Sequence, residues 1–282
     1  MSDFLLKNYS GSTPIDWKHC SEEDYIEIET ILTNGVVFFE PFIVDDFLLK
    51  DDFEELLKIF NDKKLKDIDY SRQMNKWEEN ITIPQKIIDY SVNKVKKLIN
   101  CENIQYSYHM YAHHQITNDG RVPKLPLHID WSPGAYMIDL QIGGNRDWDF
   151  VAGYKNFICK PNQAIICQPQ FDFHYRPSWN SNNPDEYYQA LFFHLVNKEH
   201  WSNLDNTYKT KNNKYAHNFG NNFRDSELFI NFQNQRKHIF ERDYIKNLNK
   251  LNLPMPPFKE TPSDEDSKRH SEKNVIPLAE KK

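Results

Sequence analysis

The pattern of hydrophobic and polar positions predicts two helices in the first part of the chain. A β-branched and aromatic run, VVFFEPFIVDDF, begins at residue 36 and leads into LLKDDFEELLKIF. Apolar residues in the second run recur every three or four positions, which indicates a strand followed by an amphipathic helix. The same spacing returns over residues 83–100, where Pro84 suits the first turn of a second helix.

From residue 103 the period becomes that of β-structure. A long alternating run, IQYSYHMYAHHQI, precedes short apolar runs about ten residues apart: LPLHID, AYMIDLQI, DFVAGY, NFICK, AIICQP, FHYR and YYQALFFHLV. Short and regularly spaced strands with no helix between them are typical of a β-barrel or jelly roll. Because two helices precede this block, the predicted fold class is α+β.

Composition divides the chain into four parts. Residues 1–35 are mixed and polar and predict a peripheral N-terminal arm, while 36–200 hold the main domain. Residues 201–251 predict a C-terminal helical extension, with a third helix over 226–249. Residues 252–282 are rich in Pro, Ser, Lys and Glu, so we expect a disordered tail that does not dock on the core.

Composition also argues against several functions. The 282 residues include only 8 glycines, and the glycine motifs of dinucleotide folds, P-loop NTPases and G-x-S-x-G hydrolases are missing. A net charge of −6 argues against a nucleic-acid partner, and the lack of 18 consecutive apolar residues argues against a membrane span. Four cysteines without a CxxC pair, and no basic-then-apolar leader, predict a cytoplasmic location.

Candidate metal ligands lie in LPLHIDW and FDFHYRPSW. Alternation in an extended segment puts His128 and Asp130 on one face, and His174 follows near the end of the strand block. Two histidines and one carboxylate on one face leave adjacent positions of a metal open, as in non-haem Fe(II) oxygenases. An HxD pair alone often occurs by chance, and the alternative for His128 is a strand histidine bonded to its neighbouring aspartate.

The chain resembles the Fe(II)/2-oxoglutarate-dependent dioxygenases of the prolyl-4-hydroxylase-like kind over roughly residues 36–197. EPFIVDDFLLKDDFEELLKIF is similar to that family's opening, LPLHIDW to its metal-binding HxD, and KPNQAIICQPQFDFHYR to the segment with its distal histidine. The resemblance implies a double-stranded β-helix (jelly-roll) core with flanking helices. It also implies a hydroxylase that uses Fe(II), 2-oxoglutarate and O₂ on a peptide, an amino acid or another small molecule. His128, Asp130 and His174 would be its metal ligands, and we assign no catalytic residue beyond them.

The sequence departs from that family at the cation for the far carboxylate of 2-oxoglutarate. The family usually has Arg or Lys about ten positions after the distal histidine, but SNNPDEYYQA, at 181–190, has neither. A buried carboxylate still needs a positive partner. Arg176 is our candidate, because it follows His174 by two positions and shares its strand face; the alternative is a surface arginine before Pro177. Other basic residues able to serve are Arg121, Lys124, Arg146, Lys155 and Lys160.

Tyrosines are further candidates for binding the co-substrate. Tyr111, on the strand before the HxD, and Tyr136, after it, carry hydroxyls suited to a carboxylate. The alternative for each is a core tyrosine with its hydroxyl at the barrel edge. The missing cation also leaves two other functions open: a cupin-like metal oxygenase or isomerase without 2-oxoglutarate, and a non-catalytic jelly-roll binding protein.

Overall fold

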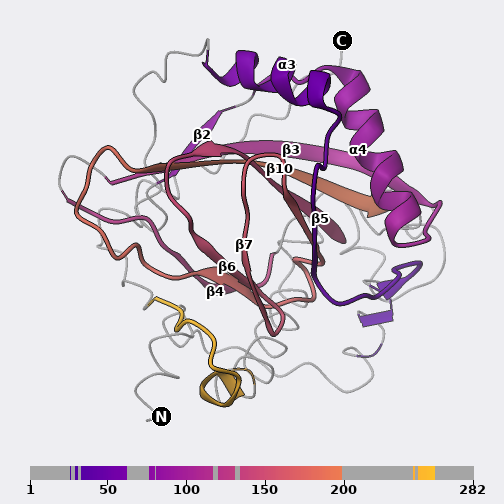
Figure 1. Cartoon of the computed structure of the whole chain (residues 1–282). Coiled ribbons are helices and arrows are strands. Elements are labelled where there is room, and N and C mark those ends of the chain that lie inside the picture. Colours follow the sequence, from indigo (N-terminus) through magenta and orange to yellow (C-terminus); the bar gives the residue numbers. More distant parts are fainter. Residues whose placement is uncertain are drawn as a thin grey trace, which may run out of the picture.

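The computed structural model contains two antiparallel sheets that face each other (Figure 1). The structure describes residues 26, 29–30, 33–61, 76–79, 81–116, 120–130, 134–198, 244 and 247–257. The major sheet contains, in spatial order, β1 (Phe42–Val44), β8 (Ala164–Cys167), β5 (Tyr136–Gly144), β10 (Tyr187–Asn197), β3 (Ile104–Gln115) and β2 (Lys76–Glu79). The minor sheet contains β4 (Leu125–His128), β9 (His174–Arg176), β6 (Asp149–Ala152) and β7 (Lys155–Ile158).

The strand block winds back and forth between the two sheets. From β4 onward, β5, β8 and β10 join the major sheet, while β4, β6, β7 and β9 join the minor sheet. This is the winding of a double-stranded β-helix, so the predicted α+β fold with a jelly-roll core and flanking helices is confirmed. Strand β2 was not predicted, because its sequence KWEE is charged and pairs only with β3 at the sheet edge.

The predicted strand near residue 36 is shorter than its sequence suggests. Only Phe42–Val44 pairs with another strand, β8. The preceding residues bind side chains in place of a neighbouring backbone: Val37 N donates to the Tyr136 hydroxyl at 2.8 Å, and Phe39 N donates to Gln168 Oε1 at 3.0 Å. The segment is therefore fastened to the barrel without extending the sheet.

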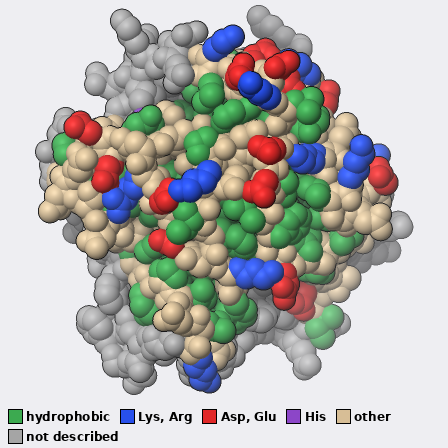
Figure 2. All heavy atoms as spheres, in the orientation of Figure 1, with side chains coloured by type: hydrophobic (Ala, Val, Ile, Leu, Met, Phe, Trp, Pro, Cys, Tyr) green, Lys and Arg blue, Asp and Glu red, His purple; other side chains and the backbone are tan. Residues whose placement is uncertain are grey.

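Both predicted helices form and cover the outer face of the major sheet (Figure 1). They are α3 (Lys50–Asn61) and α4 (Gln85–Leu98), and Pro84 directly precedes α4. Their apolar stripes pack on the sheet in one buried cluster, whose members include Leu56, Phe60, Ile87, Val95, Ile138, Leu191 and Phe193. Figure 2 shows acidic and basic side chains together over α3, at the top of the view.

A second core fills the space between the two sheets. Met137, Phe150 and Cys167 belong to one cluster there, and Trp148 and Tyr188 belong to another. The cysteines of the described residues, Cys101, Cys159 and Cys167, are all free and buried. Within the described part of the chain, no helix is long and apolar enough to cross a membrane.

The outer face of the minor sheet is covered by a C-terminal segment. Tyr244 and Leu248 pack there against Phe173 and Tyr175, with Leu253 against the same cluster. Of the predicted third helix, 244 and 247–248 are described and helical, and 249 begins the short 3-10 helix η3 (Asn249–Leu251). The rest of that helix lies outside the described residues, as do residues 1–25, 27–28 and 31–32 of the arm predicted over 1–35.

The predicted boundary of the tail, at residue 252, is wrong. The Tyr175 hydroxyl donates a hydrogen bond to the Pro254 carbonyl, and Pro256 and Pro257 are buried. One leucine and three prolines in residues 253–257 are enough for this segment to dock on the apolar outer face. The composition of the tail as a whole did not reveal this. Residues 258–282 lie outside the described residues.

Two truncations test this docking. A chain ending at Asn252 should be less stable than one ending at Pro257 by about 1 to 3 kcal/mol, because it loses the Leu253 contacts and the Tyr175 hydrogen bond. Urea unfolding of the two chains, measured side by side, gives the difference. Equal midpoints and slopes would show that residues 253–257 contribute nothing to the fold.

Candidate metal centre

His128, Asp130 and His174 come together at the edge of the minor sheet. Strands β4 and β9 pair with His128 directly opposite His174, and the two ring centroids lie 4.2 Å apart. Asp130 Oδ1 lies 3.4 Å from His128 Nε2 and 3.6 Å from His174 Nε2. One ligand atom from each residue lies within 4.8 Å of the others, so a single metal ion can contact all three.

Backbone hydrogen bonds fix how these side chains are presented. His128 Nδ1 lies 2.7 Å from the Pro126 carbonyl oxygen, and His174 Nδ1 lies 3.0 Å from that of Asp172. Because a carbonyl oxygen only accepts, each Nδ1 carries a proton and donates it, which leaves the Nε2 lone pair for a metal. Asp130 is fixed too, since its backbone N–H donates to the Pro169 carbonyl at 2.7 Å.

Charge is balanced among the three residues. Burial raises the pKa of Asp130, but the two histidines outweigh it and hold that pKa well below its ordinary value. Burial lowers the pKa of His128, and the charge of His174 lowers it further. Burial also opposes protonation of His174, but the Asp130 carboxylate raises the pKa overall. Asp130 is thus an ionised ligand that attracts a cation between the two rings.

This ligand set fits Fe(II). Imidazole nitrogens and a carboxylate suit Fe(II), and three ligands on one side leave the remaining coordination positions open, unlike a four-ligand structural zinc site. His174 is buried, whereas His128 and Asp130 are partly exposed, so the open side is reached from solvent.

Arg176 lies inside the barrel and is not a surface residue. It is 2% exposed, and its guanidinium carbon lies 4.7 Å from the ring centroid of Phe150, which is itself 5.9 Å from that of His174. Nη2 donates to Asp139 Oδ2 at 2.5 Å and to the Tyr188 hydroxyl at 3.2 Å. The Phe150 ring is therefore a neighbour of both the guanidinium and His174, and the guanidinium charge is already paired with a carboxylate.

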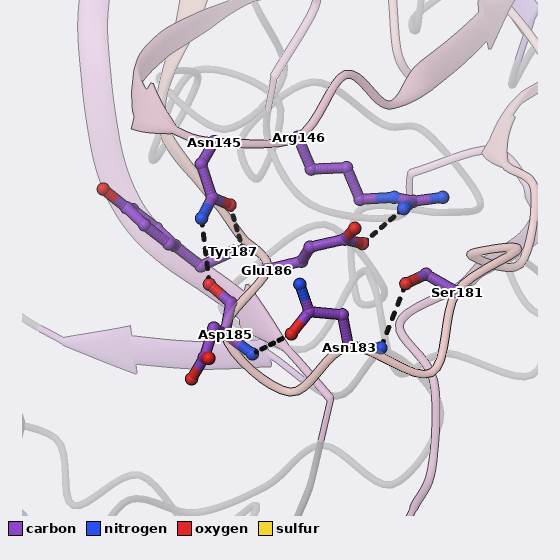
Figure 3. A network of polar contacts seen from close by, with 7 residues as sticks. All are labelled: Asn145, Arg146, Ser181, Asn183, Asp185, Glu186 and Tyr187. Atoms are coloured by element: carbon purple, nitrogen blue, oxygen red, sulfur yellow. Dashed lines mark hydrogen bonds and ion pairs between the residues drawn. The ribbon is translucent and has the colours of Figure 1, made fainter.

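The other basic candidates are engaged elsewhere. Arg146 pairs with Glu186, in a network that ties residues 181–187 to the loop after β5 (Figure 3). Lys155 Nζ lies 2.8 Å from Glu40 Oε2, and Lys160 Nζ lies 2.5 Å from Asp147 Oδ1. Arg121 and Lys124 precede β4, and both have contacts of their own. Of the six candidates, Arg176 is the one that shares a strand, β9, with a metal ligand.

Tyr111 and Tyr136 do not reach the metal centre, which corrects the prediction for both. Each belongs to the core between the helices and the major sheet, on the face away from the minor sheet. The ring of Tyr111 stacks on Phe60 of α3 at 4.4 Å, and the Tyr136 hydroxyl accepts from Val37 N. Around both positions the strand is buried on its two faces, so an aromatic side chain fits on either face. The sequence therefore does not show which face each tyrosine takes.

Asp139 is the residue that the sequence interpretation missed. It lies on β5, is completely buried, and takes the opposite face from Tyr136 and Ile138. Burial raises the pKa of this carboxyl, and the charge of Arg176 opposes that rise. Its second oxygen, Oδ1, has no hydrogen-bond partner among the described residues. The available signal was a single carboxylate in an otherwise apolar strand, AYMIDL, because a buried charge needs a partner.

Comparisons with known proteins give similar folds only. No protein-family model and no curated protein matches the chain. A viral collagen prolyl hydroxylase from Paramecium bursaria chlorella virus 1, in a 2-oxoglutarate complex, is 10% identical with a TM-score of 0.41, covering 56% of this chain and 96% of its own. An oxidoreductase of the 2OG-Fe(II) oxygenase family from Burkholderia pseudomallei is 8% identical with a TM-score of 0.43, at 64% and 93% coverage. Both likenesses concern the fold alone.

Metal binding is tested by changing the three ligands. His128→Ala, His174→Ala and Asp130→Asn should each weaken Fe(II) binding by about 100-fold or more. Loss of a residue that only hydrogen-bonds a metal ligand already costs about 10- to 100-fold, and these three residues are the ligands themselves. Asp149→Asn is the matched control, because this β6 carboxylate is on the same sheet and bonds Asn156 at 2.6 Å. Anaerobic equilibrium titration with Fe(II) measures all four. Parent-like affinity in all three ligand variants would rule out this centre.

Proposed function

We propose that the protein is an Fe(II)- and 2-oxoglutarate-dependent dioxygenase that hydroxylates a peptide, an amino acid or another small molecule. The observation that carries the proposal is the facial His128–Asp130–His174 group, with both Nε2 atoms free for a metal. Fe(II) held by two histidines and a carboxylate supplies oxidation chemistry with O₂, because adjacent positions stay open for O₂ and a co-substrate. The cytoplasm is the proposed location, because the chain has four cysteines and no CxxC pair.

The chain's own residues have separate tasks in this function. His128 and His174 present neutral Nε2 lone pairs, and Asp130 offsets one unit of the metal's charge. Arg176 would bind the far carboxylate of 2-oxoglutarate, since it is the cation inside the barrel on the strand that carries His174. A retained carboxylate ligand favours hydroxylation over halogenation, because a halide needs that position vacant.

Asp139 would compete with the far carboxylate of 2-oxoglutarate for the Arg176 guanidinium. Its carboxylate already neutralises the guanidinium, so a second carboxylate would leave one uncompensated negative charge in the barrel. Binding of 2-oxoglutarate therefore requires the Arg176–Asp139 pair to open or Asp139 to take up a proton. Burial, which raises the pKa of Asp139, favours the second route.

The direct test of the proposed function is anaerobic addition of 2-oxoglutarate to the Fe(II) protein. A 2-oxo acid that chelates Fe(II) gives a weak visible charge-transfer band, and succinate, which lacks the oxo group, is the control ligand. We expect a saturable band with 2-oxoglutarate and none with succinate. Fe(II) binding without any band would contradict the use of 2-oxoglutarate.

The role of Arg176 is tested with two co-substrates. Arg176→Ala should weaken 2-oxoglutarate binding by roughly 30-fold or more, since removing one partner of a buried charge pair typically costs about 2 to 5 kcal/mol. Pyruvate, a 2-oxo acid without the far carboxylate, serves as the internal control, and its affinity should change much less. Titrations of the charge-transfer band under argon measure both ligands. Equal loss for the two would remove Arg176 from the carboxylate site.

Asp139→Asn should have the opposite effect. With the competing carboxylate gone, 2-oxoglutarate should bind about tenfold tighter or more, and it should stabilise this variant against heat more than it stabilises the parent. Thermal unfolding with and without 2-oxoglutarate, together with the same titration, measures the change. A weaker affinity in Asp139→Asn would show that Asp139 supports the co-substrate rather than competes with it.

A metal oxygenase or isomerase without 2-oxoglutarate is the second candidate. The neutralised Arg176 favours it, and three of the other candidate cations, Arg146, Lys155 and Lys160, are paired with carboxylates as well. It predicts Fe(II) binding with no charge-transfer band from either 2-oxo acid. A non-catalytic jelly-roll protein would bind no Fe(II) at all, so the same experiment separates the three functions.

A further inference from the structure

A cavity of about 580 Å³ lies on the outer side of the metal-bearing strands. Ile129 and Phe173 line it, and each alternates with metal ligands, so their side chains point away from the metal. Pro41, from the segment before β1, and Tyr244, from the C-terminal segment, line other parts of the wall. The cavity is thus a space separate from the metal centre, built where three distant parts of the chain meet.

Aromatic rings make up much of its lining. The contributing aromatic residues are Phe39, Tyr154, Phe171, Phe173 and Tyr244. Tyr154 stacks on Tyr244 at 4.9 Å, and Phe173 lies 5.3 Å from Tyr244. The Tyr244 hydroxyl donates to the Gly153 carbonyl, which fixes this ring against the turn after β6. The rings are therefore held in place by one another and by the backbone.

The charged groups of the cavity leave one negative charge. Lys155 and Glu40 pair with each other at 2.8 Å, and Lys155 also donates to the Pro41 carbonyl at 3.2 Å. Asp172 is the third charged residue of the lining. Its Oδ2 accepts from Gln168 N at 2.9 Å, and its Oδ1 accepts no hydrogen bond within the described residues.

The geometry points to a binding site for an organic ammonium ion in this cavity. Rings attract a cation through their faces, and aromatic cages are a recurrent way to bind quaternary ammonium groups. Asp172 supplies the matching charge, and the volume lies within the range of small-molecule pockets, which are mostly apolar with a few polar groups. An anion would meet an unfavourable charge here, and a neutral apolar molecule would leave the negative charge of Asp172 uncompensated.

Choline and its carbon isostere, 3,3-dimethylbutan-1-ol, test the site, because they differ in charge and hardly in shape. Ligand-observed NMR titrations of the full chain at pH 8 give both affinities. We expect saturable binding of choline, at least about tenfold tighter than that of the isostere. Equal affinity for the two, or no saturable binding of choline, would overturn the proposal.

Two variants locate the binding. Asp172→Asn keeps the acceptor for Gln168 N and removes the charge, so it should weaken choline binding by about tenfold and leave the isostere unchanged. Tyr154→Ala removes a half-exposed wall of the cage and should weaken choline as well, with little effect on folding. Asp147→Asn, an exposed carboxylate paired with Lys160, is the control. Thermal unfolding checks each variant, and parent-like choline affinity in both Asp172→Asn and Tyr154→Ala would overturn the assignment.

Discussion

The register between β4 and β9 is the constraint on which the site depends. It sets His128, the last residue of β4, opposite His174, with Asp130 two residues beyond the strand end. Because successive side chains alternate, a slip of one residue would turn His174 outward and bring Phe173 or Tyr175 to the metal face. The outer face resists such a slip, since Phe173 and Tyr175 are packed under the C-terminal segment. Packing on one side of the minor sheet thus holds the ligands on the other.

The same alternation of side chains along β9 places the charged Arg176 inside the barrel. Two residues beyond His174, the strand places Arg176 between Trp148, Phe150 and Tyr188, and Asp139 is the carboxylate that balances its charge among the described residues. A buried ion pair of this kind is weak evidence for stability, but removing either partner is costly. It sets the electrostatic condition for any anion that enters the barrel. The metal centre and this ion pair therefore share a neighbour, Phe150, whose ring lies 4.7 Å from the Arg176 guanidinium carbon and 5.9 Å from the His174 ring.

The features that could be predicted from the sequence are those with a regular spacing of apolar or chemically similar residues. The helices α3 and α4, the strand block and the HxD followed by His174 all show clear spacing, and Arg176 shares the face of His174 as alternation requires. The faces of Tyr111 and Tyr136 were not predictable, because β5 and residues 111–114 of β3 are buried on both sides, so burial does not distinguish the two faces there. The partnership of Asp139 with Arg176 joins residues 37 positions apart on strands of different sheets, and it forms only because the two sheets face each other.

The central claim is that one metal ion binds between His128, Asp130 and His174. The most direct measurement is an anomalous difference map at the iron edge from crystals loaded with Fe(II) under argon. The account predicts a peak about 2.0 to 2.3 Å from both Nε2 atoms and from an Asp130 carboxylate oxygen, the usual range for such metal–ligand bonds. Iron bound elsewhere in the chain, or crystals with no iron at this site despite saturating Fe(II), would contradict it.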